Sequence, residues 1–244
     1  MSSVNKPTVL ITGAGRGLGK QMALAFAKKG YLVGIHYFKS ATDAQQTYEE
    51  ILHNQGEAKL FTADVGDSIQ VNAMFKEISS NWGRLDVLVN NAGITRDRTL
   101  FKMSDEEWRD VMRVNLDGSF YCVRAALPLM RNQKSGSIIN IISYVAPRGV
   151  RGGGNYAVSK AGLTTLTKNV AIEEGSNGIR ANAIMPGFHL TDMNKTLWER
   201  YEKIIRDQHM LAEMPRREEL GEFVVSIAEL KTVSGQVFSF ESRN

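Results

Sequence analysis

The sequence predicts a doubly wound α/β fold, in which helices cover both faces of one parallel sheet. Two observations carry this prediction: short apolar runs alternate with longer amphipathic stretches, and several of the runs are apolar at consecutive positions. Strands that helices bury on both faces show that pattern. The length of 244 residues suits one large domain of this class. We therefore expect residues 1–244 to form a single domain.

The apolar runs give the expected strands, at residues 8–12, 31–37, 59–63, 85–89, 137–142, 180–185 and 236–240. Helices are expected in the amphipathic stretches at 17–29, 42–54, 67–81, 105–131, 155–175 and 216–230. Ser, Thr, Asn or Asp opens several of these helices as an N-cap. Because strands and helices take turns, right-handed crossovers should join the strands into a parallel sheet.

Composition argues against several functional classes. The net charge is +4, but Lys and Arg are scattered, unlike the basic face of a nucleic-acid-binding protein. The chain has no signal-peptide pattern and no run of about 18 apolar residues for a membrane span, so we expect a soluble cytoplasmic protein. Cys122 is the single cysteine and cannot form an internal disulfide. No metal site is expected, because the four histidines are isolated: His36, His53, His189 and His209.

A glycine-rich turn, T-G-A-G-R-G-L-G, follows the first expected strand and opens the first helix. Glycine lets the chain turn sharply and approach a phosphate, and a helix N-terminus offers free N–H groups to it. The spacing is T-G-x-x-x-G-x-G rather than G-x-G-x-x-G, and a merely flexible turn is the alternative. The position between strand and helix favours a dinucleotide-binding Rossmann fold. The contacts expected from this turn are Gly13, Arg16, Gly17, Leu18 and Gly19.

Tyr156 and Lys160 lie four residues apart in a later expected helix and would therefore share one helix face. A nearby ammonium lowers the pKa of a phenol from about 10 toward the range in which it exchanges a proton with a substrate oxygen. Ser143 would offer a second hydroxyl to that oxygen. The pattern predicts carbonyl chemistry with a nicotinamide cofactor, although a solvated helix face can show the same spacing.

Taken with these motifs, the chain resembles the short-chain dehydrogenase/reductase family over nearly its whole length. Within that family, the segment 91–97 and Asp192 most resemble 3-oxoacyl-(acyl-carrier-protein) reductases. The matching motifs occur in the family's order: the glycine turn, Asp64-Val65, Asn90-Asn-Ala-Gly93, Asn115, Ser143, Tyr156-x-x-x-Lys160 and Pro186-Gly187.

The resemblance implies a role for each catalytic residue. Tyr156 would give a proton to the carbonyl oxygen, and Lys160 would lower the pKa of Tyr156 and hold the nicotinamide ribose. Ser143 would polarise the carbonyl, and Asn115 would support a water-linked proton relay. Taken singly, Ser143 can also cap a strand end, and Asn115 can satisfy helix backbone.

The resemblance also implies the cofactor contacts. Asp64 would accept the adenine amine, unless it caps the helix that begins near Asp67. Asn91 and Gly93 would line the ribose, and Thr191 would hold the carboxamide. The remaining implied contacts are Val65, Ala92, Pro186 and Gly187, together with Tyr156 and Lys160 from the catalytic set.

The cofactor is expected to be NADP rather than NAD. NAD enzymes place Asp or Glu about 20 residues beyond the glycine turn, where it accepts the ribose 2′-OH. That window here reads H-Y-F-K, without a carboxylate. Arg16 and Lys39 could meet a 2′-phosphate, and Tyr37 stands where the carboxylate would be.

The substrate is predicted only as a class. The resemblance favours NADPH-dependent reduction of a 3-oxoacyl thioester of acyl carrier protein or CoA, as in fatty acid biosynthesis. Asn177 stands where carrier-protein reductases often have a basic residue, which favours CoA or a free ketone. A dehydrogenase of a steroid, polyol or cyclic alcohol is one alternative, and a non-catalytic NAD(P)-sensing regulator is another. Residues 188–214 are expected to form a substrate lid, or else the packed face of two helices.

A homotetramer, or at least a dimer, is also expected. The helices predicted at 105–131 and 155–175 carry more apolar residues than one sheet face needs, and pairing across a two-fold axis would bury the excess. These residues are Val114, Phe120, Leu127, Leu163, Leu166 and Val170.

Overall fold

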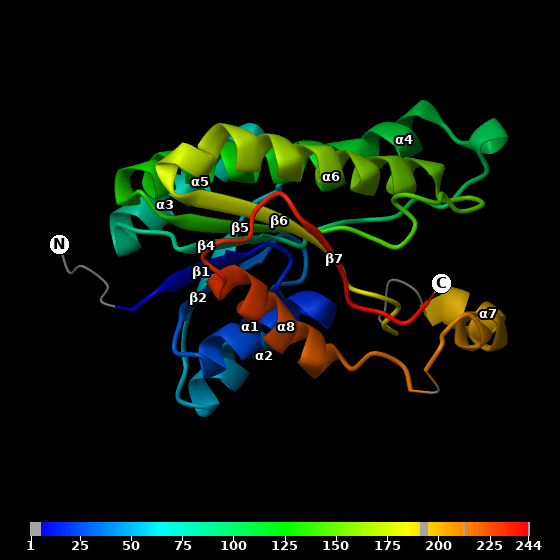
Figure 1. The fold of residues 1–244 in the computed structure, drawn as a ribbon, viewed down its shortest axis with the longest axis horizontal. Coiled ribbons are helices and arrows are strands. Elements are labelled where there is room, and N and C mark those ends of the chain that lie inside the picture. Colours follow the sequence, from blue (N-terminus) through cyan, green and yellow to red (C-terminus); the bar gives the residue numbers. More distant parts are fainter. Residues whose placement is uncertain (1–5, 191–194, 212, 244) are drawn as a thin grey trace.

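The structure, a computed structural model, describes residues 6–190, 195–211 and 213–243. Within those ranges seven parallel strands form one sheet in the order β3-β2-β1-β4-β5-β6-β7 (Figure 1). All seven predicted strands are present, with ends shifted by one or two residues. They are β1 (Thr8–Ile11), β2 (Leu32–Tyr37), β3 (Glu57–Thr62), β4 (Val87–Asn90), β5 (Gly136–Ile141), β6 (Ile179–Met185) and β7 (Val237–Ser239).

Helices cover both faces of this sheet, which confirms the doubly wound α/β fold (Figure 1). Buried apolar side chains form two main clusters, one on each face of the sheet. Each such side chain stabilises the fold by roughly 1.5–3 kcal/mol relative to exposure. The first face carries α1 (Gly17–Lys28), α2 (Ala41–His53) and α8 (Arg217–Glu229), and the second carries α3 (Ser68–Trp82), α5 (Gly118–Gln133) and α6 (Gly154–Glu174).

One expected helix is interrupted. The stretch predicted as a single helix at 105–131 consists of α4 (Asp105–Met112), a π-helical turn (Arg113–Asp117) and α5. Within the wide turn, the Asn115 side chain accepts a hydrogen bond from Ile94 N at 2.8 Å and donates one to Ile94 O at 3.0 Å. Turns of this kind often occur at functional sites. Apolar periodicity assumes a uniform helix and therefore does not reveal the inserted residue.

A ladder of buried polar side chains joins the sheet to α6. Asn90 Nδ2 donates to Asn140 Oδ1 at 2.9 Å, and Asn140 Nδ2 donates to Thr167 Oγ1 at 2.8 Å. Thr167 in turn donates to Leu163 O at 2.7 Å. Because buried polar groups are costly to leave unpaired, this ladder favours one position of α6 over the sheet. It thereby fixes the helix that carries Tyr156 and Lys160.

The prediction of which side chains face a subunit interface is partly wrong. Leu163 and Val170 are 1% and 6% exposed, and Leu166 packs against the core, because these side chains face the sheet. Phe120 is 41% exposed, and on α6 the exposed apolar side chains include Val158 and Ile172, at 47% and 80%. Val114 and Leu127 also pack against the core.

Helix α7 (Lys195–Asp207) occupies the segment predicted as a lid. It lies beside the end of the sheet rather than over either face (Figure 1). The Trp198 ring stacks on the Phe188 ring with 5.5 Å between centroids, and the Arg206 guanidinium lies 5.0 Å from the Trp198 ring. Thr191 and Asp192 lie outside the described residues. Across the described ranges, no helix is long and apolar enough to cross a membrane.

Strand β1 pairs with β2 on one side and with β4 on the other. The crossovers on the two sides of β1 therefore run in opposite directions and leave a crevice at the carboxyl ends of the strands. Open α/β sheets bind their ligands at such a switch point.

Candidate active site

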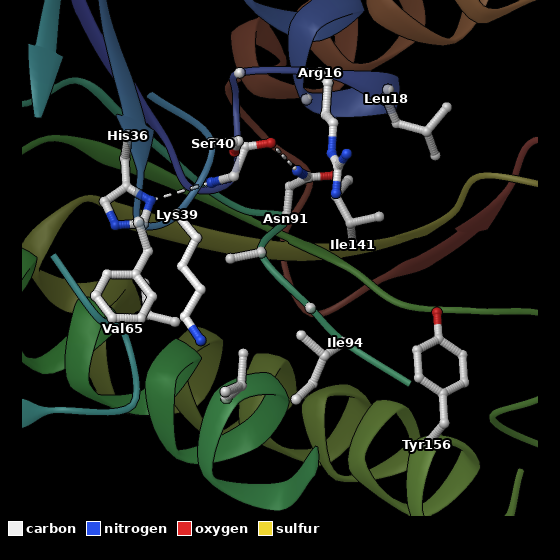
Figure 2. A pocket seen from close by; sticks show the side chains of 18 of the residues that line it. Arg16, Leu18, His36, Lys39, Ser40, Val65, Asn91, Ile94, Ile141 and Tyr156 are labelled. Atoms are coloured by element: carbon white, nitrogen blue, oxygen red, sulfur yellow. Dashed lines mark hydrogen bonds between the residues drawn. The ribbon is translucent and has the colours of Figure 1, made fainter. Parts of the chain in front are cut away.

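A cavity of about 610 Å³ opens at the carboxyl ends of the strands. Figure 2 shows His36, Lys39 and Val65 at one end and Tyr156 at the other. Four described residues predicted for the site are not among those lining it: Tyr37, Asn115, Ser143 and Gly187. The predicted residues that line it are Gly13, Arg16, Gly17, Leu18, Gly19, Lys39, Asp64, Val65, Asn91, Ala92, Gly93, Tyr156, Lys160 and Pro186.

The glycine turn forms the wall of the cavity between β1 and α1. Gly13 and Gly17 have φ of 65° and 58°, the left-handed region that glycine adopts without strain. Gly19 lies so close to the turn that a Cβ would be 2.2 Å from Gly13 O. Asn91 Nδ2 braces the turn by donating to Thr12 O at 2.9 Å and to Gly13 O at 3.1 Å. The glycines thus hold the turn close to the start of α1, where free N–H groups can meet a phosphate.

His36 supports the same turn and was not predicted as a site residue. Its Nδ1 accepts a hydrogen bond from Gly13 N at 3.1 Å, and its Nε2 lies 2.9 Å from Ala63 O (Figure 2). This pair of partners requires a neutral ring with the proton on Nε2. Burial lowers the pKa of His36 to about 4, so the ring is neutral at physiological pH. The signal in the sequence was its place near the end of the expected strand at 31–37, because the carboxyl ends of parallel strands meet at the edge of the sheet where the glycine turn lies.

The buried His36 ring predicts a pH dependence of stability. The unfolded chain binds a proton at this ring below its ordinary pKa of 6.5, and the folded chain only below about 4. The contribution of this neutral ring to the free energy of unfolding is therefore fully present above pH 6.5. It is lost as the pH falls through this window, by on the order of 3 kcal/mol. Urea unfolding from pH 7 to 4 should show a steeper loss in wild type than in His36→Asn. The exposed His53→Asn should follow wild type, and parallel curves for all three proteins would contradict the prediction.

Tyr156 and Lys160 come together in the first turns of α6. The Lys160 Nζ lies 5.8 Å from the centroid of the Tyr156 ring and donates to Ile141 O at 2.8 Å. The hydroxyls of Tyr156 and Ser143 share a hydrogen bond. Ser143 is not a cavity-lining residue itself, but this bond places its hydroxyl beside the one at the cavity end.

The pKa of Tyr156 differs from the sequence-based expectation. Burial raises it above the ordinary value, and the hydrogen bond from Ser143 acts in the opposite direction. The Lys160 ammonium donates to the Ile141 carbonyl, and burial lowers its own pKa to about 8. The phenol is therefore protonated at neutral pH, which is the form that can donate a proton.

Asn115 acts from behind the cavity wall. Its Nδ2 donates to Ser159 Oγ at 3.1 Å, and the Ser159 hydroxyl donates to Tyr156 O at 2.8 Å. Together with its bonds to Ile94, this connects the π-helical turn, the loop after β4 and the start of α6. Asn115 therefore does not simply satisfy the backbone of its own helix.

At the other end of the cavity, Asp64 does not cap a helix. Asp67 caps α3, with its carboxylate accepting from Ile69 N and Gln70 N. The Asp64 carboxylate instead accepts from Gly66 N at 2.9 Å and from Arg113 Nη1 at 2.8 Å.

The ribose window requires a correction at Tyr37. This side chain packs against the core cluster beneath α1, while the cavity is lined by the residues that follow it, Phe38, Lys39 and Ser40. Alternation along β2 explains the difference, because neighbouring side chains point to opposite faces. Arg16 lies 3.8 Å from the Asp43 carboxylate. In the described part of the chain, Lys39 has no ion-pair partner, and its Nζ lies 5.6 Å from the Phe38 ring.

Comparison with known proteins identifies the family. The short chain dehydrogenase family model matches residues 7–202. The 3-oxoacyl-[acyl-carrier-protein] reductase FabG of Staphylococcus aureus (strain Mu50) is 41% identical over 231 residues, which cover 94% of each chain. The 3-oxoacyl-[acyl-carrier-protein] reductase of Synechocystis sp. is 44% identical over 197 residues, 81% of this chain and 80% of that protein.

A solved structure agrees with this match. The crystal structure of a gluconate 5-dehydrogenase from Burkholderia cenocepacia J2315, in complex with NADP and tartrate, has a TM-score of 0.92 and 28% sequence identity to this chain. The match covers 98% of this chain and 95% of that one. The chain therefore belongs to the short chain dehydrogenase family, and it is an NAD(P)-dependent oxidoreductase that acts on carbonyl or secondary alcohol groups.

Proposed function

We propose that this protein reduces a 3-oxoacyl thioester to the 3-hydroxyacyl thioester with NADPH. One observation carries the proposal: Tyr156, the proposed proton donor, and the glycine turn line the same cavity. Reduction of a carbonyl needs a hydride donor and a proton donor at the same carbon–oxygen bond, and this arrangement supplies a place for each. The relatives from Staphylococcus aureus and Synechocystis, both named 3-oxoacyl-[acyl-carrier-protein] reductases, support the thioester as substrate.

The residues present fit a dinucleotide. Gly13 and Gly19 let the turn pack closely, since a Cβ at either would come within 3.1 Å of neighbouring backbone, and this packing holds the start of α1 where its N–H groups can meet a phosphate. When bound, the cofactor supplies the hydride. Further residues that would hold the cofactor line the cavity: Asp64, Val65, Asn91, Ala92, Gly93, Lys160 and Pro186. Gly187 follows Pro186, and Thr191 lies outside the described residues.

The chain's own residues would then handle the substrate oxygen and the proton. The hydroxyls of Ser143 and Tyr156 would hold the carbonyl oxygen, and Tyr156 would donate its proton as negative charge develops there. The ammonium of Lys160, 5.8 Å from the ring, would stabilise the phenolate that remains. Asn115 would keep the tyrosine backbone in place through Ser159.

We propose NADP rather than NAD as the cofactor, because Lys39 lies at the ribose end of the cavity without an ion-pair partner among the described residues. Lys39→Ala should therefore raise the Kd of NADPH by roughly tenfold, the loss of one charge-assisted contact, and leave that of NADH nearly unchanged. Fluorescence titration measures both. The exposed Lys28→Ala on α1 serves as the control, and an equal loss for the two cofactors in Lys39→Ala would refute the assignment of Lys39.

The substrate class is tested with a panel of acyl-CoA, acyl carrier protein, cyclic ketone and keto-sugar-acid substrates, with NADPH oxidation followed by absorbance. We expect the 3-oxoacyl thioesters to give the highest kcat/KM. The keto-sugar acid belongs in the panel because the structural neighbour is a gluconate 5-dehydrogenase. Turnover of none of these substrates would instead favour the NAD(P)-sensing regulator, although the complete set of Asn115, Ser143, Tyr156 and Lys160 argues against it.

The thioester carrier is proposed to be acyl carrier protein or CoA. Asn177, at the position where a basic residue would favour an acidic carrier protein, donates to Glu174 Oε2 at 2.9 Å. Arg131 forms an ion pair with the same Glu174 carboxylate, so the positive charge of Arg131 is partly neutralised. This local balance favours CoA at this surface, while the names of the relatives favour the carrier protein.

We also propose a homotetramer, assembled through the outward faces of α5 and α6. Phe120, Val158 and Ile172 support it, because each is an exposed apolar side chain on one of these helices. The substrate lid over residues 188–214 likewise remains a proposal, supported by the stack of Phe188 and Trp198 beyond β6.

A further inference from the structure

The cavity has a reacting end and an adenine end. If NADPH binds as proposed above, its nicotinamide must lie at the Tyr156 end, where the proton donor is. The dinucleotide then extends past the glycine turn to the ends of β2 and β3, where Asp64 lines the cavity. The following inference rests on that proposed function and concerns this far end.

Arg113 is a further cation at the adenine end of the cavity, and it belongs to none of the sequence motifs described above. It is the first residue of the π-helical turn and lines the cavity. Its Nη1 donates to Asp64 Oδ2 at 2.8 Å, and its guanidinium fills the space beside Gly66, where a Cβ would be 2.2 Å from Nη1. The side chain is 42% exposed, so a ligand in the cavity can still reach it.

We propose that Arg113, together with Asp64, binds the adenine ring and so sets the affinity for NADPH and NADH alike. Each Asp64 oxygen accepts one hydrogen bond within the chain, from Gly66 N or from Arg113, and retains acceptor capacity for a purine amine. A guanidinium is planar and stacks on aromatic rings, which an adenine provides.

Charge balance separates this role from recognition of the 2′-phosphate. The positive charge of Arg113 is paired with Asp64, whereas Lys39 has no ion-pair partner in the part of the chain that the structure describes. Arg113 also offsets the negative charge that Asp64 would otherwise present to a cofactor bearing phosphates. Removing Arg113 should therefore weaken the binding of every adenine nucleotide by a similar factor.

The test measures the Kd of NADPH, NADH and AMP by isothermal titration calorimetry, without turnover. Arg113→Ala should raise all three by roughly three- to tenfold. The NADPH to NADH ratio should stay at the wild-type value, in contrast to Lys39→Ala, which should change it. In turnover assays, Arg113→Ala should raise the KM for the cofactor and leave kcat at saturation nearly unchanged.

Two further variants keep the inference testable if Arg113→Ala folds poorly. Gly66→Ala leaves Arg113 in the sequence but places a methyl group where the guanidinium lies, so it should weaken the same three ligands. Arg113→Lys keeps the charge and loses the planar group, and should fall between wild type and Arg113→Ala.

Unchanged Kd values in Arg113→Ala and Gly66→Ala would overturn the inference, and so would a loss confined to NADPH, which would make Arg113 a 2′-phosphate contact. A wild-type protein that binds neither dinucleotide would overturn the proposed function as well. The two failures are therefore distinguishable.

Discussion

Tyr156→Phe should lower kcat by at least about a hundredfold, the low end of the contribution from general acid catalysis. The substitution removes one oxygen atom and keeps the ring, so the packing against α6 and the cavity wall should remain. The Ser143 hydroxyl remains in this variant, but an aliphatic alcohol is a much weaker acid than a phenol and does not replace it as the proton donor. Steady-state kinetics on the best substrate of the panel measure the loss.

The control for this variant is Tyr121→Phe. Tyr121 is a partly buried tyrosine on α5, packed against the core and away from the cavity lining. It should retain wild-type kcat, which shows that removing a tyrosine hydroxyl is not by itself damaging. The Kd of NADPH should be unchanged in both variants. Near-normal turnover by Tyr156→Phe would rule out this tyrosine as the proton donor.

The layers of the fold were predictable because they depend on local patterns. Runs such as 8–12 and 137–142 are apolar at consecutive positions, and only a strand covered on both faces explains this in a chain with regular helices between. The glycine turn was predictable for a similar reason, since its local backbone conformation requires residues without a side chain. Tyr156 and Lys160 share a helix face, and their spacing alone indicates it.

The rest of the site depends on contacts between distant segments. The hydrogen bond between His36 and Gly13 joins residues 23 positions apart, and that between Arg113 and Asp64 joins residues 49 positions apart. No local sequence pattern predicts either hydrogen bond. Tyr37 was misplaced because the strand alternation sets which side chain faces the cavity, and the register was not fixed by the sequence.

The interface prediction failed at Leu166 for a related reason. Helix α6 has apolar residues on more than one side, so a period of 3.6 residues does not distinguish the side that packs on the sheet from the side that faces outward. The structure places Leu166 against two of the core clusters and leaves Ile172 exposed.

Gly19→Ala should abolish most cofactor binding, with an increase of at least about tenfold in the Kd of NADPH. The added Cβ would lie 2.2 Å from Gly13 O and 2.9 Å from Ala14 Cα, and both are backbone atoms that cannot rotate away. It would also meet Asn91 Nδ2 at 2.7 Å, the group that braces the turn. The turn must therefore move away from α1, and the N–H groups aimed at the phosphate move with it. The overlap should also lower the free energy of unfolding by about 1–3 kcal/mol.

Gly175→Ala provides the matched control, because a Cβ there meets nothing within 4 Å and the residue has φ of −57° at the end of α6. It should bind NADPH like wild type and be slightly more stable, since alanine restricts the unfolded chain more than glycine does. Calorimetric titration and urea unfolding of the three proteins separate the two effects of Gly19→Ala. Binding at wild-type affinity by Gly19→Ala would mean that the dinucleotide phosphates do not contact this turn. A loss of stability without a loss of affinity would lead to the same conclusion, because it would show that the turn moved while the ligand contacts did not.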